Sequence, residues 1–242
     1  MSKTLGVTDK AKVVAMLVGL SLQTYFSIQH VQAAAYLASR AVRLERRYAA
    51  GSTCNLGVAI KGYAASSLFT TVAFLEALVN ELFADAAKSS GGHLSAIDEK
   101  SRSLIAELGQ TESVERAAVM SKFDLLLRAA GSNPIDRDRN PSQDLSTAIR
   151  LRNELVHYKA EWLDSGTPGM VRPGNLYESK LAKQMQGRFR DRPGLHSSDS
   201  WLGGGCATWA VRNAVAYTDE VFTRLGVTPL YEHVRSQLAI EK

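Results

Sequence analysis

Apolar residues at helical spacing constrain this chain more than any other feature of its sequence. In the stretch FLEALVNELF the side chains of Leu75, Leu78, Val79, Leu82 and Phe83 recur every three or four residues, which places them on one face of a helix. No segment alternates apolar and polar residues as a half-buried strand does, and no internal repeat is present. The sequence therefore predicts an all-α fold.

The same spacing predicts a series of helices along the chain. Gly131 stands at the position favoured after a helix end, and Asn140, Pro141 and Gln143 have the order of an N-cap, a first-turn proline and a capping-box partner. The expected helices span residues 11–48 (one helix, or two with a kink), 63–88, 97–108, 113–130, 141–162 and 205–226, with a short amphipathic piece at 176–189 and a final short helix from Leu230.

Length and composition favour a single globular domain over residues 1–242. A chain of this length with 45% hydrophobic residues can bury one sizeable core. Cys54 and Cys206 form no C-x-x-C pair, so the sequence predicts neither a disulfide framework nor a zinc site, and a reducing cytosol fits best. The apolar run Val13–Leu22 superficially resembles a signal peptide, but it lies too far from the small residues Ala33–Ala35 and is shorter than the ~20 residues of a membrane span. We expect it to begin a buried helix.

Positive charge is concentrated in two regions of the sequence. Residues 1–50 carry seven Lys or Arg against two acidic residues, and residues 170–192 carry six against two. The segments 51–169 (twelve against fifteen) and 193–242 (four against five) are mildly acidic. Basic patches attract phosphate backbones by releasing counterions. Solvated helix ends and a soluble basic loop at about 164–204 explain the same pattern equally well.

The helix expected at 141–162 places an arginine where its apolar face should continue. Arg152 falls in the middle of the apolar stripe, and Asn153 and His157, four residues apart, share its flank. An unpaired guanidinium would be expensive to desolvate there. Three explanations remain open: an ion pair with a buried carboxylate such as Glu76, a side chain that extends along its own stem to solvent, or contact with a partner or ligand.

The spacing R-N-x-x-x-H formed by Arg152, Asn153 and His157 resembles the motif of the HEPN superfamily, in which four to six residues, often a polar one first, separate an arginine from a histidine. The segments FLEALVNELF, PSQDLSTAIRLRNELVHYKAEW and GCATWAVRNA also look like HEPN-type proteins in their usual order, over about residues 60–225. The resemblance implies a helical bundle that dimerises with its two motif helices facing each other. It would make the apolar stripe around Arg152 a subunit interface.

In its active members, the resemblance implies a metal-independent endoribonuclease. RNA carries its own nucleophile, the 2′-OH, so cleavage needs proton transfer, for which His157 is suited, and charge stabilisation at phosphorus, for which the planar guanidinium of Arg152 is suited. Asn153 would orient the phosphate or the imidazole. The expected products carry 2′,3′-cyclic phosphate and 5′-OH ends. No cofactor or metal is expected, and the five histidines contain no H-x-x-x-H pair.

Supporting residues are each open to a plainer interpretation. Glu76 could orient the site or neutralise Arg152, or be an ordinary solvated glutamate, and Tyr158 and Lys159 could contact phosphate or be part of an exposed helix end. A further group of basic residues, interleaved with an aromatic one, could hold RNA by charge and stacking or belong to a solubilising loop. These are Lys180, Lys183, Arg188, Arg190 and Arg192, with Phe189.

Two other kinds of protein fit the same residues. One is a non-catalytic HEPN module that binds a nucleotide, RNA or a protein as a dimeric scaffold, and the other is a helical structural protein with a buried Arg–Glu pair. The resemblance suggests a cytoplasmic protein of defence, stress or toxin–antitoxin systems, with an antitoxin or regulatory protein as partner and no membrane. One HEPN branch has a tyrosine two residues after the histidine, whereas Tyr158 follows His157 directly. Modification at that tyrosine is therefore not carried over.

Overall fold

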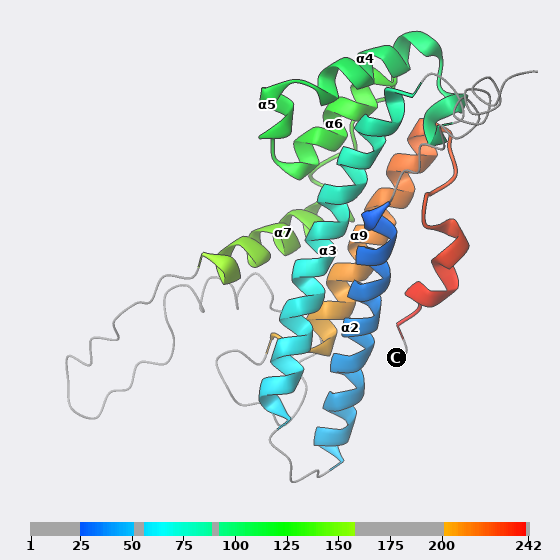
Figure 1. Cartoon of the computed structure of the whole chain (residues 1–242). Coiled ribbons are helices and arrows are strands. Elements are labelled where there is room, and N and C mark those ends of the chain that lie inside the picture. The colour runs from blue at the N-terminus through cyan, green and yellow to red at the C-terminus, as the bar shows by residue number, and fades with distance from the viewer. Residues whose placement is uncertain (1–24, 51–55, 89–91, 158–200, 241–242) are drawn as a thin grey trace, which may run out of the picture.

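Three long helices lie side by side along most of the molecule (Figure 1). They are α2 (Phe26–Ala49), α3 (Gly57–Ala86) and α9 (Gly204–Leu225). The computed structural model describes residues 25–50, 56–88, 92–157 and 201–240. Across these ranges the regular structure is helical and no strand occurs, so the predicted all-α fold is confirmed.

The central helix is α3, because it is apolar on most of its circumference and a helix of that kind is stable only when neighbours cover it. Phe74, Leu75, Leu78 and Leu82 are fully buried in one hydrophobic cluster with side chains of α6 and α9. By length and composition, α3 is the one helix among the described residues that could cross a membrane. Here its apolar side chains form the core of the bundle.

Small side chains allow α2 and α3 to approach closely. Ala34, Ala38 and Ala41 of α2 pack with Ala64 of α3 in a second cluster, and all four are fully buried. Across this contact the buried hydroxyl of Ser67 donates a hydrogen bond of 2.9 Å to the carbonyl oxygen of Ala34. The polar group is therefore satisfied without widening the helix pair.

A group of shorter helices covers the C-terminal half of α3, at the top of Figure 1. It contains η1 (His93–Ala96), α4 (Glu99–Gly109), α5 (Glu112–Glu115) and α6 (Val119–Ala129). The continuous helix predicted at 113–130 is wrong, because the chain turns between α5 and α6. Alanines at 117 and 118 favour a helix locally, but α5 contacts α4, whereas α6 contacts α3 and α9 as well as α4. The predicted role of Gly131 is confirmed by its positive φ of 74° and by the hydrogen bond from Ser132 N–H to Leu127 O.

The motif helix α7 spans Ser142–Val156 and starts differently from the prediction. Pro141 occupies the N-cap position and no side-chain cap is formed, so the predicted N-cap role of Asn140 and capping-box role of Gln143 are wrong. The backbone N–H of Gln143 instead donates to the carbonyl of Arg139 in the preceding turn. Backbone groups thus satisfy the helix start, which makes a side-chain cap unnecessary.

A short 3₁₀ helix, η2 (Glu232–Leu238), follows α9, where a final short helix from Leu230 was predicted. Tyr231 attaches this segment to α9: its fully buried hydroxyl lies 2.6 Å from Thr218 Oγ1 and donates a hydrogen bond of 2.7 Å to Asp219. Arg235 adds an ion pair of 2.8 Å to the same Asp219.

Several predictions concern parts of the chain outside the described residues. They are the N-terminal portion of the helix expected at 11–48, residues 158–162 of the expected motif helix, the amphipathic piece at 176–189 and nearly all of the basic loop at 164–204. The predicted continuation of the motif helix through His157 is wrong, because α7 ends at Val156.

Candidate functional site

The motif helix α7 is fastened to α3 and α9 by its own apolar face. Ala148 and Leu151 are fully buried in a cluster with Leu68 of α3 and Cys206 of α9. Within this chain, α3 and α9 thus cover most of the stripe that the resemblance would make a subunit interface. Among the described residues of this face, Val156 in the last turn of α7 is 54% exposed.

Arg152 forms an ion pair with Glu76, one of the three explanations left open by the sequence. The distance from Nη2 of Arg152 to Oε1 of Glu76 is 2.5 Å. The pair is only partly shielded, because the two side chains are 23% and 51% exposed. The Nε atom of Arg152 is buried and has no hydrogen-bond partner within the described parts of the chain. The expected carboxylate is thus present, but it is not buried.

Asn153 and His157, the other two motif residues, are both exposed, and His157 marks the end of the helix. Its backbone N–H donates a hydrogen bond of 2.9 Å to the carbonyl of Asn153, and its φ and ψ of −104° and 29° leave the helical region. The supporting candidates Tyr158 and Lys159 lie outside the described residues. So do the five basic candidates Lys180, Lys183, Arg188, Arg190 and Arg192.

A groove of about 480 Å³, here called the motif groove, lies between α3, α7 and the α5–α6 segment. Arg152 and Asn153 line it from α7, but His157 does not. Ser146 also contributes from α7, donating a hydrogen bond of 3.2 Å to the sulfur of Met120 on α6. The other polar residues that line it are Glu76, Asn80, Glu115, Lys122 and Arg137.

Lys122 is a functional candidate that the sequence interpretation missed. The residue is only 8% exposed, and its ammonium group donates a hydrogen bond of 3.0 Å to Oδ1 of Asn80. No carboxylate in the described structure forms an ion pair with it, whereas Arg137 and Arg152, which line the same groove, each have one. The sequence contains a sign of this burial, because Lys122 stands directly before the apolar Phe123, just as Arg152 stands directly after the apolar Leu151.

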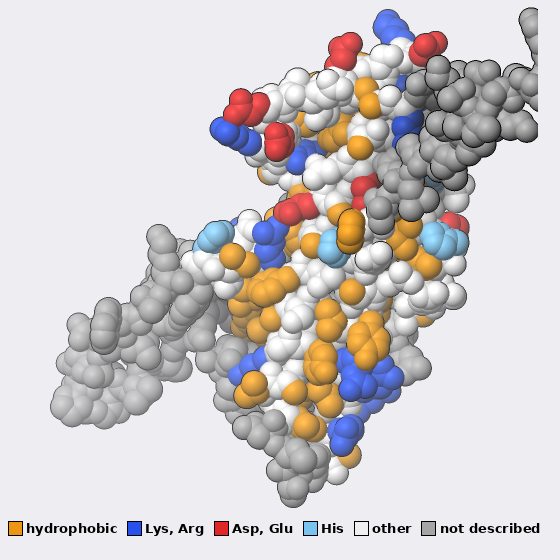
Figure 2. Space-filling view, in the orientation of Figure 1, with side chains coloured by type: hydrophobic (Ala, Val, Ile, Leu, Met, Phe, Trp, Pro, Cys, Tyr) orange, Lys and Arg blue, Asp and Glu red, His pale blue; other side chains and the backbone are white. Residues whose placement is uncertain are grey.

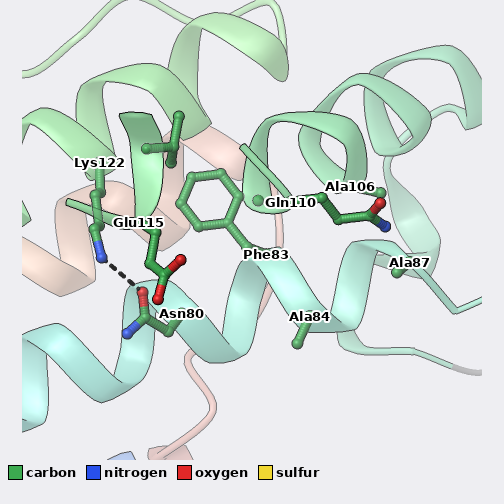
Figure 3. Close-up of a pocket in the computed structure, with 10 residues that line it drawn as sticks. Asn80, Phe83, Ala84, Ala87, Ala106, Gln110, Glu115 and Lys122 are labelled. Carbon is green, nitrogen blue, oxygen red and sulfur yellow. Dashed lines mark hydrogen bonds between the residues drawn. The ribbon is translucent and has the colours of Figure 1, made fainter. Parts of the chain in front are cut away.

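A second groove of about 510 Å³, here called the side groove, adjoins the first (Figure 3). Asn80, Glu115 and Lys122 line both grooves. Figure 3 shows Lys122 reaching from α6 to Asn80 on α3, with the carboxylate of Glu115 beside them and Gln110 farther along the groove. Apolar side chains, among them Phe83, Ala84, Ala87 and Ala106, form the rest of its lining.

The N-terminal basic region predicted from charge is partly visible on α2. Arg43, Arg46 and Arg47 are exposed there, and the guanidinium of Arg40 lies 5.9 Å from the ring centre of Tyr63. In Figure 2 no acidic side chain is visible around the ends of α2 and α3 that carry this charge. Glu45, the acidic residue of α2, is buried and accepts a hydrogen bond from the N–H of Gly204. The outer side of α2 is therefore strongly basic.

Neither thiol nor metal chemistry is indicated by the described residues. Burial raises the pKa of the Cys206 thiol to about 12, so this group stays protonated at neutral pH. No group of three or more His, Cys, Asp or Glu side chains is placed to hold a metal ion within the described ranges.

The motif groove combines hydrogen-bond donors with a surplus lysine, an arrangement suited to an anionic group such as phosphate. No protein-family model, curated protein or solved structure matches this chain.

Proposed function

We propose that this protein is a metal-independent endoribonuclease of HEPN type whose active site contains Arg152, Asn153 and His157. One observation carries the proposal: the consecutive residues Arg152 and Asn153 line the same groove, one turn before an exposed histidine. Glu76 restrains the guanidinium through one nitrogen, and the buried Nε still lacks a partner among the described residues. Phosphate oxygens, like carboxylate oxygens, are acceptors that suit the guanidinium group.

The proposed reaction uses the 2′-OH of RNA as nucleophile. A histidine removes the 2′-OH proton, the 2′-oxygen attacks phosphorus, and the bond from phosphorus to the 5′-oxygen breaks as that oxygen receives a proton. Arg152 stabilises the charge on the non-bridging oxygens, and Asn153 orients the phosphate. The products are a 2′,3′-cyclic phosphate and a 5′-OH end, and DNA is resistant because it lacks the nucleophile.

We propose that a second copy of the chain completes this site. His157 does not line the motif groove, so within one chain it is not placed beside the phosphate that Arg152 would hold. His157 and Val156 are both exposed on the last turn of α7, which leaves this end of the helix accessible to another chain. In such a dimer one histidine could act as base and the other as acid.

The position of His157 outside the groove also favours a second candidate, a non-catalytic module that binds a nucleotide, RNA or a protein as a dimeric scaffold. In either case the proposed setting is cytoplasmic, in defence, stress or toxin–antitoxin systems, with an antitoxin or regulatory protein as a further partner. The two candidates differ in one outcome. A nuclease whose His157 is replaced loses cleavage but still binds RNA, whereas the non-catalytic module binds without cleaving even as the parent protein.

The decisive experiment compares four proteins on a mixed-sequence RNA with EDTA present: the parent, Arg152→Ala, His157→Ala and the control His233→Ala. His233 is exposed and distant in sequence from the motif, so its substitution removes an imidazole without touching the proposed site. We expect the parent and His233→Ala to cleave, leaving cyclic-phosphate ends, and the two motif variants to be inactive. Equal cleavage by His157→Ala, or cleavage of an all-DNA analogue at a similar rate, would refute the mechanism.

Light scattering tests the two-chain site independently. A mass equal to two chains at micromolar concentration is expected, and substitution of the exposed Val156 by Asp should lower it to one chain because a charge would be buried in the contact. A parent protein that cleaves RNA as a single chain would contradict the shared site.

A further inference from the structure

Lys122 is a buried cation that forms no ion pair within the described parts of the chain. Burying an ammonium group is costly unless an anion accompanies it. Asn80 supplies one neutral acceptor at 3.0 Å, and no described carboxylate completes an ion pair. Because Lys122 lines both grooves, an anionic ligand in either of them could reach its ammonium group.

The two grooves differ in the chemistry of their linings. The polar part of the motif groove contains the cations Lys122, Arg137 and Arg152 against the carboxylates Glu76 and Glu115. Arg137 and Arg152 each form an ion pair, which leaves Lys122 as the cation without one among the described residues. The side groove is mostly apolar, with Gln110 and Glu115 as polar groups at its edge (Figure 3). A phosphate suits the first and a flat heterocycle suits the second, since ligand pockets combine apolar walls with a few placed polar groups.

We propose that the two grooves together bind one nucleotide of the RNA beside the cleaved bond, with Lys122 on its phosphate and its base in the side groove. Glu115 and the amide oxygen of Gln110 accept hydrogen bonds from an exocyclic amino group, so adenine or cytosine is preferred over uracil. This subsite rests on the proposed ribonuclease function and adds to it a positioning residue and a base preference.

The volume of the side groove, about 510 Å³, lies within the range typical of small-molecule sites. Glu115 faces Lys122 from α5 without forming an ion pair, so it remains available to a ligand. Arg116, its neighbour, is instead paired with Glu112 on the outside of the helix at 2.7 Å. The polar groups that would contact the base are therefore not consumed by internal ion pairs.

Binding is tested in the His157→Ala background, so that RNA is not consumed. Fluorescence anisotropy measures the Kd of a labelled cytosine- and adenine-rich hexanucleotide at several salt concentrations, with Lys122→Met compared to Arg128→Met. Both substitutions remove one positive charge from α6, but Arg128 is exposed. Lys122→Met should weaken binding about tenfold and reduce the salt slope by about 0.7, the contribution of one phosphate contact on a single strand. Equal effects of the two variants would overturn the subsite.

The base preference has its own test, which uses exposed residues that tolerate substitution. The His157→Ala protein should bind the cytosine- and adenine-rich hexanucleotide about fivefold more tightly than a uracil-only one. Adding Gln110→Ala or Glu115→Ala should make the two Kd values equal. Equal binding of both by the His157→Ala protein would refute the preference. If the parent protein binds RNA through Lys122 without cleaving it, that result would reject the nuclease function but retain the nucleotide subsite.

Discussion

Two carboxylates in the C-terminal half of α3, Asp85 and Glu76, lie in contrasting surroundings. Asp85 is 2% exposed and accepts hydrogen bonds from the N–H of Leu94 at 2.8 Å and from the hydroxyl of Tyr25 at 3.2 Å, with the ammonium of Lys88 at 3.4 Å. The side chain of Glu76 is 51% exposed and contacts one nitrogen of Arg152. The carboxylate of Asp85 thus has three partners in its own chain. The pair of Glu76 and Arg152 still contains a donor that is unused among the described residues, the Nε of Arg152.

This difference separates a carboxylate with several internal hydrogen bonds from one in a partly exposed ion pair, where we propose that RNA binds. A buried carboxylate that accepts several hydrogen bonds is costly to remove, because its donors are left unpaired. A partly exposed ion pair contributes little, because water already solvates both charges well. Substitutions at the two carboxylates should therefore differ in their effect on the free energy of unfolding, from the largest at Asp85 to the smallest at the Glu76–Arg152 pair.

The largest effect is expected for Asp85→Ala, which should lower the free energy of unfolding by about 3 kcal/mol, because the donors of Leu94 and Tyr25 lose their acceptor inside the protein. Urea denaturation measures the change. The control Asp138→Ala removes an exposed carboxylate and should change stability by less than about 0.5 kcal/mol. Similar values for both variants would mean that Asp85 is not an anchor.

Acid should weaken the Asp85 anchor specifically. Burial raises the pKa of this carboxyl, but hydrogen bonds from the backbone N–H groups of Leu94 and His93, helped by Lys88, outweigh burial and hold the pKa below its usual value of 3.8. A lowered folded-state pKa contributes stability that is complete above the usual value and is lost as the pH falls through the folded value. Below pH 3.8, Asp85→Asn should therefore lose stability less steeply than the parent. Parallel curves would contradict this.

A somewhat smaller loss is expected for Gly204→Ala at the start of α9. A Cβ there would lie 2.7 Å from Cγ2 of Val42 and 2.9 Å from its backbone Cα, so α2 and α9 would have to separate. We expect a loss of about 2 kcal/mol. Gly62→Ala is the matched control, since nothing lies within 4 Å of its added Cβ in α3, and it should gain up to about 1 kcal/mol. Two losses of equal size would argue against a close α2–α9 contact.

The smallest effect on stability is expected at the motif. A double-mutant cycle with Arg152→Ala and Glu76→Ala should give a coupling energy of about 0.5 kcal/mol, because both partners are partly exposed. His157→Ala should leave the melting temperature nearly unchanged, since its side chain is exposed. A coupling of about 3 kcal/mol would instead be the behaviour of a buried structural pair. That result would favour the structural protein over the nuclease.

The sequence alone determined the helical character of the chain and many of its helix ends. Apolar spacing located α3 and α9 to within a few residues, apart from the start of α3, and Gly131 ended α6 as expected, because these features depend on neighbours three or four positions apart. An ion pair between Arg152 and Glu76 was one of the explanations offered for an arginine in the apolar stripe, because an unpaired guanidinium there would be costly to desolvate. Such local rules need no knowledge of the fold.

Tertiary structure decided the rest, because it depends on which surfaces meet. The break between α5 and α6 allows α6 to contact α3 and α9 as well as α4. The stripe of α7 is covered by α3 and α9, although its sequence fits a subunit interface equally well. Only the fold brings Lys122 beside Asn80, 42 positions away, and next to the groove that contains Arg152. Helical periodicity identifies a buried face, but it does not specify what covers that face or which charges meet across it.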